Sequence, residues 1–459
     1  MRALRFSPLK KIIPNWQITL STHLDSGFRR NDNVEVFHCR SNIRIIPLLR
    51  EQLMKRDWHS QFADDIRDYG GYSIGKLFAL LNDPGIISLA GGLPSPEIFL
   101  KNEMRFASQS RLNEDIERIM QYSSTAGEIS LIEAIIEFLA RDGINISKDN
   151  IVITSSGQQG LDLTGRLFLN PDDVVLVDRP TFAGAIVAFQ MERPKFSGVD
   201  IREDGSDVDG FRQKIEDLRK KNRTPKFIYV VPDFQNPTGI TMSLKKREAL
   251  LDLSYQYDIP IVEDSPYRVL RYYGTTIPSI FSLDQARDGG NVIGVYTFSK
   301  LFCPGMRVGF NIGPKDVIEK MTNIKEGNVL NTPKYNQDMC TAFLKEMGWE
   351  AHIENCRSYY REKLEAFLET MENNFPGEAG VTWTKPEGGL FLWVSVPEKI
   401  DTLNLFHEAI KFKVAFVPGA TFYADNPATN HMRINFSYPS KEQLVAAAKR
   451  LSGCIRSQL

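Results

Sequence analysis

A single lysine near residue 300 lies in a setting that suits covalent chemistry. Lys300 falls in the stretch YTFSKLFCPGMRVGF, with two hydroxyl residues just before it and an arginine seven positions after it: Thr297, Ser299 and Arg307. The apolar run NVIGVYTF that leads into it is typical of a buried strand. Burying a lysine costs free energy and lowers its pKa, so the amine becomes a nucleophile toward a carbonyl. The sequence therefore predicts a Schiff base between Lys300 and either a substrate or a cofactor.

Polar residues also follow two other strand-like runs. Asp264 ends IPIVED and Tyr267 comes three residues later, while Asn236 follows KFIYVVP within VPDFQNPTG. Taken alone, an acid at a strand end is more often a helix N-cap, and Asn-Pro is a turn signal. Together they match what pyridoxal phosphate needs, a carboxylate at its pyridine nitrogen and hydrogen-bond donors at its phenolic oxygen.

The remaining parts of that cofactor also find candidate partners. Hydroxyls and a guanidinium near Lys300 suit a dianionic phosphate, and the turn SSGQQGL, which opens a helix, adds backbone N–H groups. Phe182 in DRPTFAG offers an aromatic face on which the ring could stack. We therefore expect Lys300 to carry pyridoxal 5'-phosphate, with the residues around it holding the phosphate.

The elements that position these residues indicate an α/β fold. From about residue 145, runs that are apolar throughout alternate with helical segments, which is typical of a mostly parallel sheet covered by helices. Such sheets bind ligands at the carboxyl ends of their strands, where these candidates fall. From about residue 350 a long charged helix and a few strands favour a smaller α+β domain.

The composition is that of an ordinary globular protein. The 459 residues favour two domains and a core large enough to need no disulfides. The 56 Lys and Arg residues balance 57 Asp and Glu residues, which argues against a nucleic-acid partner, and no apolar run is long enough to span a membrane. The cysteines are scattered without a C-x-x-C pair, so we expect no metal site and free thiols in a reducing, cytoplasmic compartment: Cys39, Cys303, Cys340, Cys356 and Cys454.

The first 50 residues are basic, with nine Lys or Arg and three acids. An organelle transit peptide has this character, but we favour a tail outside the fold, from an over-extended translation start, so that a chain beginning at Met54 would fold and work like the full one. We expect four parts: the tail 1–53, a segment 54–105 capping the active site, a large cofactor-binding domain 106–345 and a small C-terminal domain 346–459.

Taken in their order, six motifs resemble the class I and II aminotransferases of fold type I: QQGLDLTGRLFL, DRPTF, DFQNPTG, VEDSPY, TFSKLFCPGMRVGF and MRINFS. SLAGGLPSPEIF near residue 90 is similar to the N-terminal signature of the 2-aminoadipate and kynurenine aminotransferase subgroup. The resemblance, from about residue 70 onward, implies a large domain with a mostly parallel seven-stranded sheet. It also implies ping-pong transfer of an amino group from an aromatic, branched-chain or 2-aminoadipate-type L-amino acid to a 2-oxo acid, with 2-oxoglutarate expected.

The resemblance also assigns roles to residues that match the family's motifs. Lys300 would form the Schiff base, Asp264 would pair with the pyridine nitrogen, and Asn236 and Tyr267 would bind the phenolic oxygen. Phe182 would stack on the ring, where the family usually has a tyrosine. The phosphate would be held by Gly157, Gln158, Thr297, Ser299 and Arg307.

Further matches concern the substrate and a second subunit. Arg433 in HMRINF would bind the substrate's α-carboxylate, with Gly92 in AGGLP and Asn236 close to the substrate. Tyr122 in QYSSTAG would reach the cofactor phosphate of a neighbouring subunit, which implies a homodimer with shared active sites. Gly75 stands where the subgroup usually has an arginine for acidic side chains, so the adjacent Lys76 would have to take that contact.

Two alternatives remain open at this point. Fold and cofactor do not fix the reaction, so a β-lyase or a decarboxylase could use the same scaffold. Aminotransferase-like domains also serve as ligand sensors in bacterial transcription regulators, although no helix-turn-helix pattern precedes the motifs here.

Overall fold

The structure is a computed structural model that describes residues 57–67, 83, 85–375 and 380–459. The chain divides into two compact units, Met1–Tyr69 and Gly70–Leu459. The described part of the first unit holds the 3-10 helix η2 (His59–Gln61) and the short helix α2 (Asp64–Arg67). Every element discussed below belongs to the second unit.

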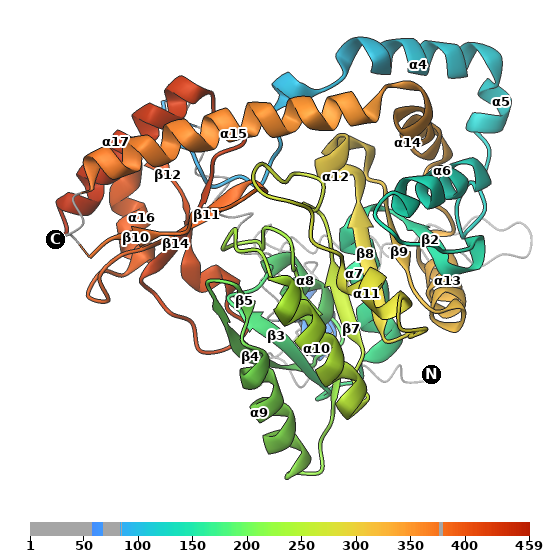
Figure 1. Cartoon of the computed structure of the whole chain (residues 1–459), viewed down its shortest axis with the longest axis horizontal. Coiled ribbons are helices and arrows are strands. Elements are labelled where there is room, and N and C mark those ends of the chain that lie inside the picture. Colours follow the sequence, from blue (N-terminus) through green and yellow to red (C-terminus); the bar gives the residue numbers. More distant parts are fainter. Residues whose placement is uncertain (1–56, 68–82, 84, 376–379) are drawn as a thin grey trace, which may run out of the picture. The chain divides into compact units, whose positions relative to one another are not determined.

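Eight strands form the large sheet, in the order β2-β9-β8-β7-β6-β3-β4-β5. Neighbours from β8 to β4 are parallel, whereas β9 is antiparallel to both β2 and β8, and β5 to β4. The strands are β2 (Ile151–Thr154), β3 (Val174–Arg179), β4 (Lys195–Arg202), β5 (Gly205–Ser206), β6 (Pro225–Val230), β7 (Ile261–Asp264), β8 (Val292–Thr297) and β9 (Gly309–Ile312). β2, β7 and β9 are buried along their whole length because helices cover both faces of the sheet (Figure 1).

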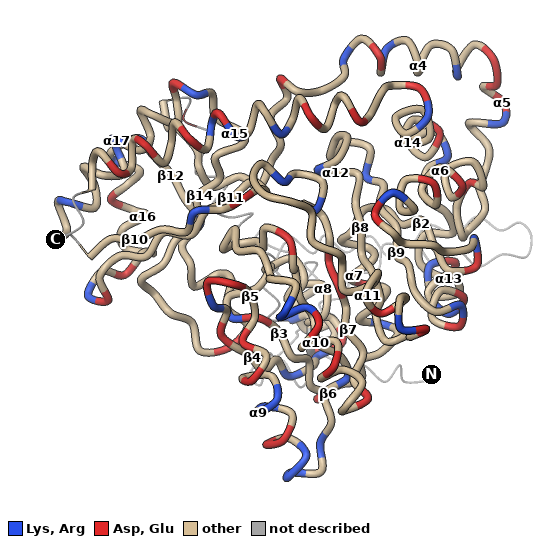
Figure 2. Tube along the Cα trace, viewed as in Figure 1, with Lys and Arg blue, Asp and Glu red and all other residues tan. Residues whose placement is uncertain are grey.

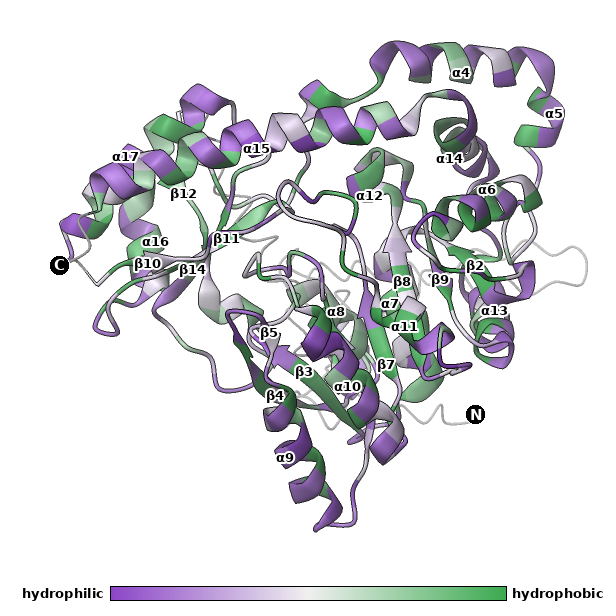
Figure 3. Cartoon of the chain, in the orientation of Figure 1, coloured by the Kyte–Doolittle hydropathy of each residue, from purple (hydrophilic) through white to green (hydrophobic). Residues whose placement is uncertain are grey.

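Helices alternate with these strands along the chain. Those before and around the large sheet are α4 (Lys101–Glu114), α5 (Ile116–Ile119), α6 (Ile129–Ala140), α7 (Ser156–Phe168), α8 (Ala183–Gln190), α9 (Val208–Arg219), α10 (Leu244–Tyr257), α11 (Ile280–Gln285), α12 (Phe298–Leu301), α13 (Lys315–Val329) and α14 (Lys334–Glu346). Short 3-10 turns are η4 (Pro96–Ile98), η5 (Lys148–Asn150) and η6 (Pro304–Met306). Figure 3 shows apolar strands inside and hydrophilic outer faces on helices such as α9.

A second, antiparallel sheet follows the long helix α15 (Trp349–Asn374). Its order is β10-β11-β14-β13, with β10 (Thr382–Trp383), β11 (Phe391–Ser395), β13 (Val417–Pro418) and β14 (His431–Asn435). α15 packs along α17 (Lys441–Arg456), and α16 (Thr402–Lys411) and η8 (Gly419–Phe422) complete this region (Figure 1). β1 (Ile87–Ser88) pairs in parallel with β12 (Val414–Ala415), which joins the segment before α4 to the C-terminal region.

The predicted α/β fold, with a mostly parallel large sheet and a smaller α+β region, is confirmed. The large sheet has one strand more than the seven expected, because the two-residue β5 adds to the β4 edge. The expected boundaries at 53, 105 and 345 stay predictions.

The surface and the cysteines agree with the composition. Both signs of charge alternate on the outer helices α9, α13, α15 and α17 (Figure 2). The four described cysteines are free and buried, as predicted, while Cys39 lies outside the described residues. None of the described helices is long and apolar enough to cross a membrane. A cytoplasmic location stays a prediction.

Candidate active site

The carboxyl ends of four strands meet at one edge of the large sheet. β6, β7 and β8 are parallel to one another, and β2 shares their direction because both β2 and β8 are antiparallel to β9. α7 follows β2 and α12 follows β8, while irregular loops follow β6 and β7. Residues that are far apart in the sequence therefore come together at this edge.

A cavity of about 250 Å³ lies there. Ten of the residues singled out in the sequence line it: Gly157, Gln158, Phe182, Asn236, Asp264, Tyr267, Thr297, Ser299, Lys300 and Arg307. Leu93, Ser156, Leu161, Val231, Pro266 and Pro304 complete the lining. Three candidates lie outside it: Arg433 and Gly92 contact lining residues, whereas the side chain of Tyr122 is 77% exposed. Gly75 and Lys76 lie outside the described residues.

Lys300 extends from the one-turn helix α12 at the end of β8. Burial lowers the pKa of its ammonium to about 8, and the positive charges of Arg433 and Arg307 act in the same direction. Its Nζ donates a hydrogen bond to the Gly92 carbonyl at 2.5 Å. A lysine with this pKa is partly neutral near physiological pH, and the neutral amine is the form that attacks a carbonyl.

Asp264 is the last residue of β7 and is 5% exposed. The Tyr229 hydroxyl, from β6, donates a hydrogen bond to its Oδ2 at 2.8 Å. Burial raises the pKa of Asp264 to about 7, and the hydrogen bond from Tyr229 opposes that rise. The Tyr267 ring lies edge-on against Phe391, with 5.8 Å between ring centroids.

Hydroxyl and guanidinium groups gather at the other end of the cavity. The Thr297 hydroxyl caps α12 by accepting from the Ser299 N–H at 3.1 Å. Arg307 donates to the hydroxyls of Ser156, at 2.5 Å, and Ser299, at 3.4 Å. Ser156 begins α7, a thirteen-residue helix whose first-turn N–H groups have no helical partner. Together these donors form a site suited to a phosphate dianion.

A glycine in β9 allows these groups to approach one another. A Cβ on Gly309 would lie 2.6 Å from the Tyr296 carbonyl oxygen and 2.7 Å from the Gly157 nitrogen. Both contacts are with backbone, so no side-chain rotation could relieve them. The phosphate-type donors at one end, the amine of Lys300 and the carboxylate of Asp264 form a donor set that fits pyridoxal phosphate.

Arg433, on β14, is 3% exposed although it carries a positive charge. It donates hydrogen bonds to Asn236 Oδ1 at 3.0 Å and to the Ala90 carbonyl at 2.7 Å. Its guanidinium carbon lies 4.3 Å from the centroid of the Phe391 ring and 4.9 Å from that of Phe422. These rings hold the guanidinium flat by cation–π contact, next to a cavity-lining amide. A guanidinium in this position can bind a carboxylate with two hydrogen bonds.

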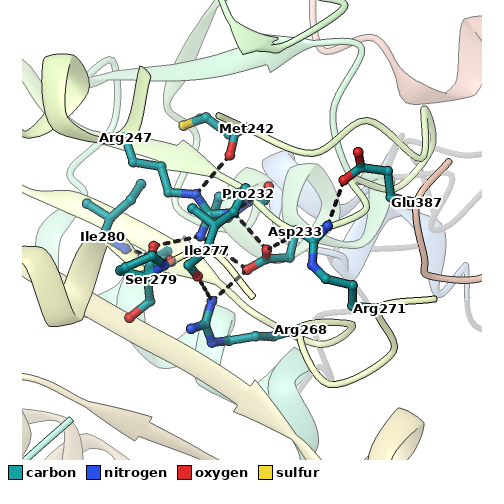
Figure 4. A network of polar contacts seen from close by, with 12 residues as sticks. Pro232, Asp233, Met242, Arg247, Arg268, Arg271, Ile277, Ser279, Ile280 and Glu387 are labelled. Atoms are coloured by element: carbon teal, nitrogen blue, oxygen red, sulfur yellow. Dashed lines mark hydrogen bonds and ion pairs between the residues drawn. The ribbon is translucent and has the colours of Figure 1, made fainter. Parts of the chain in front are cut away.

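One buried carboxylate joins three arginines (Figure 4). Asp233 contacts Arg247 at 2.7 Å, Arg268 at 3.2 Å and Arg271 at 3.9 Å, and all four side chains are at most 6% exposed. This network is close to the site along the chain, because Asp233 comes three residues before Asn236 and Arg268 directly follows Tyr267. Arg271 also pairs with Glu387, just before β11. The arginines lower the pKa of Asp233 against the opposing effect of burial.

Several residues near the site were not found from the sequence. Ser156 lies in the quoted turn SSGQQGL, and its left-handed φ of 76° is a feature of structure rather than of sequence. Tyr229 is the one hydroxyl in the apolar run FIYVV, and this was the available signal. Asp233 follows the same run by two residues, but its partners come from separate segments, so no spacing revealed them.

Within the described ranges, no group of three or more His, Cys, Asp or Glu side chains could hold a metal ion.

Comparisons with known proteins identify the family of this chain. A family model described as aminotransferase class I and II matches residues 90–451. An aromatic-amino-acid aminotransferase of Thermococcus litoralis is 36% identical over 404 residues, which cover 88% of this chain and 96% of that protein. The crystal structure of Pyrococcus horikoshii kynurenine aminotransferase in complex with PMP matches with a TM-score of 0.84 at 38% identity, covering 88% of this chain and 98% of that one. An α-aminoadipate aminotransferase of Thermus thermophilus, complexed with N-(5'-phosphopyridoxyl)-L-leucine, matches with a TM-score of 0.80 at 34% identity, covering 88% and 99%.

Proposed function

Because this chain belongs to the class I and II aminotransferases, we propose that it moves the amino group of an aromatic, branched-chain or 2-aminoadipate-type L-amino acid to a 2-oxo acid, with 2-oxoglutarate as acceptor. The enzyme is an aminotransferase (EC 2.6.1) that uses pyridoxal 5'-phosphate. When bound, this cofactor supplies a carbonyl carbon that takes the amino group and a ring that withdraws electrons from the substrate's Cα.

The cavity residues would hold the cofactor at three points. The hydroxyls of Thr297, Ser299 and Ser156, with Arg307 and the start of α7 at Gly157 and Gln158, would bind the phosphate. Asp264 would bind the pyridine nitrogen, and Asn236 and Tyr267 the phenolic oxygen. Phe182, at the N-cap of α8, would cover one face of the ring. Three separate contacts would fix the ring in one orientation, which the reaction requires.

Arg433 would bind and orient the substrate. Its guanidinium would form two hydrogen bonds with the α-carboxylate. It already contacts the cavity residue Asn236, and the Gly92 carbonyl accepts from Lys300. Fixing the carboxylate sets which bond at Cα is perpendicular to the ring, and that bond breaks most readily. The aromatic rings of Phe391 and Phe422 hold the guanidinium and leave few alternative positions.

Lys300 would move the proton. With the amino acid held at Arg433, the free amine of Lys300 would accept the proton from the substrate's Cα. With its pKa lowered to about 8 by burial, the amine can both accept and return a proton near neutral pH. The same amine acts in the second half-reaction, in which a 2-oxo acid takes up the amino group, so the kinetics should be ping-pong.

The observation that carries this proposal is the position of Lys300, Asp264 and Arg307 in one cavity, with Arg433 hydrogen-bonded to the cavity residue Asn236. Support for the range of substrates comes from the named activities of the relatives, which include aromatic amino acids, kynurenine and 2-aminoadipate. Part of the substrate-side-chain region, at Gly75 and Lys76, lies outside the described residues.

The decisive experiment is the visible absorption spectrum of the purified protein during addition of single amino acids without an acceptor. Conversion of the cofactor from its aldehyde to its amine form, reversed by 2-oxoglutarate, supports the proposal, and the amino acids that cause it give the specificity. Release of ammonia, pyruvate or a decarboxylated amine without need of a 2-oxo acid would instead indicate a β-lyase or a decarboxylase.

A homodimer with shared active sites is part of the proposal. Four large apolar side chains between residues 106 and 129 are more than half exposed, and Tyr122 lies among them: Phe106, Ile116, Met120 and Ile129. Exposed apolar side chains of this kind, on or next to α4, α5 and α6, suit burial against a second copy. Sedimentation should give twice the 52.2 kDa chain mass, and Met120→Asp should shift the protein toward the monomer and lower its affinity for the cofactor. A fully active monomer would contradict shared sites.

A further inference from the structure

One buried polar contact behind the cavity has no part in the steps above. Tyr229 lies near the end of β6 and is 0% exposed, and its hydroxyl donates to Asp264 Oδ2 at 2.8 Å. Tyr229 is not among the residues that line the cavity, whereas Asp264 is. Tyr229 therefore reaches the carboxylate from the protein interior, and it does not touch a ligand in the cavity.

The position of this hydroxyl is fixed by the sheet. Tyr229 is in register with Val177 of β3 and Val262 of β7, so the strand that carries it is paired on both sides. Its ring packs edge-on against Phe189 of α8, with 5.5 Å between centroids and 79° between planes. Because the strand is paired on both sides and the ring packs against Phe189, the phenol loses little further conformational freedom when it donates a hydrogen bond. The bond is thus built in by the fold.

Resting on the proposed function, we propose that Tyr229 is a positioning residue for transamination. Its hydroxyl holds Oδ2 of Asp264 and so presents the ionised carboxylate to the pyridine nitrogen of the cofactor.

The hydrogen bond from Tyr229 favours the ionised form of Asp264. Burial raises the pKa of Asp264 to about 7, and the hydrogen bond from Tyr229 opposes that rise. Without it, a larger fraction of Asp264 would be neutral at pH 7, and a neutral carboxyl cannot stabilise a protonated pyridine nitrogen.

Other titratable groups lie near Tyr229 and Asp264, and their effect on the pH dependence has to be distinguished from that of this pair. The charges of Tyr267, after β7, and Asp178 of β3 add to the rise in the pKa of Tyr229 that burial causes. Lys300 and Arg307 are the basic side chains that line the neighbouring cavity, and Arg433 of β14 is hydrogen-bonded to its lining residue Asn236. Burial raises the pKa of Asp178 to about 7, and the Ser206 hydroxyl donates to it at 2.6 Å. Asp178 would therefore titrate in the same range as Asp264, and an Asp178→Asn variant is needed to distinguish the two.

The test is the affinity of the cofactor-free protein for pyridoxal phosphate between pH 6 and 9, measured by fluorescence for the wild type and Tyr229→Phe. We expect binding of Tyr229→Phe to be about tenfold weaker at pH 7, with the pH midpoint about one unit higher, since one hydrogen bond to a charged group is lost. The midpoint of kcat/KM should move by a similar amount. The matched control is Tyr296→Phe, because the Tyr296 hydroxyl is buried without a hydrogen-bond partner among the described residues, and its removal should leave the midpoint in place.

Two further variants keep the result interpretable. In the Asp264→Asn background Tyr229→Phe should have no further effect on cofactor binding, whereas in the Asp178→Asn background its shift should persist. If Tyr229→Phe folds poorly, 3-fluorotyrosine at position 229 keeps the shape, donates a stronger hydrogen bond and should move the midpoint down. An unchanged midpoint in Tyr229→Phe or with fluorotyrosine, or a shift that disappears with Asp178, would overturn the proposal. Failure of the wild type to bind the cofactor would instead contradict the proposed function.

Discussion

The buried carboxylate of Asp233 should be one of the most sensitive positions of the protein, and Asp233→Asn tests this. The substitution keeps the size of the side chain but removes the only carboxylate that contacts both Arg247 and Arg268 among the described residues. Arg247 is 0% exposed, and its other contacts are neutral carbonyl oxygens at Met242, Pro278 and Pro232. Removing one partner of a buried ion pair costs about 3–5 kcal/mol, because a charge is left without compensation. That is a large part of the 5–15 kcal/mol that is usual for a native protein.

The assay is urea unfolding of the purified variants at pH 7, followed by tyrosine and tryptophan fluorescence. The matched control is Asp252→Asn, which makes the same chemical change in the surface pair with Arg287 (2.6 Å; Asp252 66% exposed) and should cost less than about 1 kcal/mol. The folded-state pKa of Asp233 is lowered, so its contribution is complete above the unfolded pKa of about 3.9 and is lost as the pH falls through the folded value. The difference between the wild type and Asp233→Asn should therefore be equal at pH 7 and pH 5. A loss no larger than that of the control, or one that disappears between pH 7 and 5, would refute the reasoning.

Three further predictions concern the site itself. Lys300→Ala should retain weak cofactor binding but reduce kcat on the order of 10⁴-fold, as rapid-reaction absorbance would show, because the proton-transfer group is lost; normal turnover would refute its assignment. Arg433→Lys should lower kcat/KM roughly 10- to 100-fold for every amino acid, since it keeps the charge but loses the paired hydrogen bonds, and unchanged constants would place the carboxylate site elsewhere. Gly309→Ala should weaken phosphate binding, measured by calorimetric titration, and lower the free energy of unfolding, measured in urea, by about 1–3 kcal/mol. The control Gly305→Ala, whose added Cβ meets nothing within 4 Å, should change neither quantity.

The strands that carry the site were predictable because they are buried on both faces. IPIVED has no polar residue before Glu263, and NVIGVYTF has no charged residue and is apolar after its first position up to Thr297, so the polar residues that follow stand out. The positions of Asp264 and Lys300 follow from that pattern and from the common direction of parallel strands. β5 was not predictable in the same way, because two residues are too few to show any alternation.

Long-range partners could not be read from the sequence. Tyr229 and Asp264 are 35 positions apart, and their hydrogen bond depends on the register of β6 against β7, which no local pattern specifies. The three arginines around Asp233 likewise come from separate segments, α10 and the loop after β7. An arginine in a helical segment is usually exposed to water, so the burial of Arg247 could not be expected. Arg433 was recognised through the family resemblance alone, since on a strand a surface position would otherwise be expected.

The chain just after β1 has a mechanical consequence for the enzyme. Three carbonyls of this segment, at Leu89, Ala90 and Leu93, accept hydrogen bonds from β14 or the residues after it, and β1 itself pairs with β12. One carbonyl, at Gly92, accepts from Lys300 at the end of the large sheet. If the two sheets rotate relative to each other, the single hydrogen bond between Lys300 and Gly92 would break before the three bonds to β14 and the residues after it. The segment would then travel with the C-terminal sheet as one rigid body, so that Arg433 keeps its backbone neighbours while their distance from Lys300 changes.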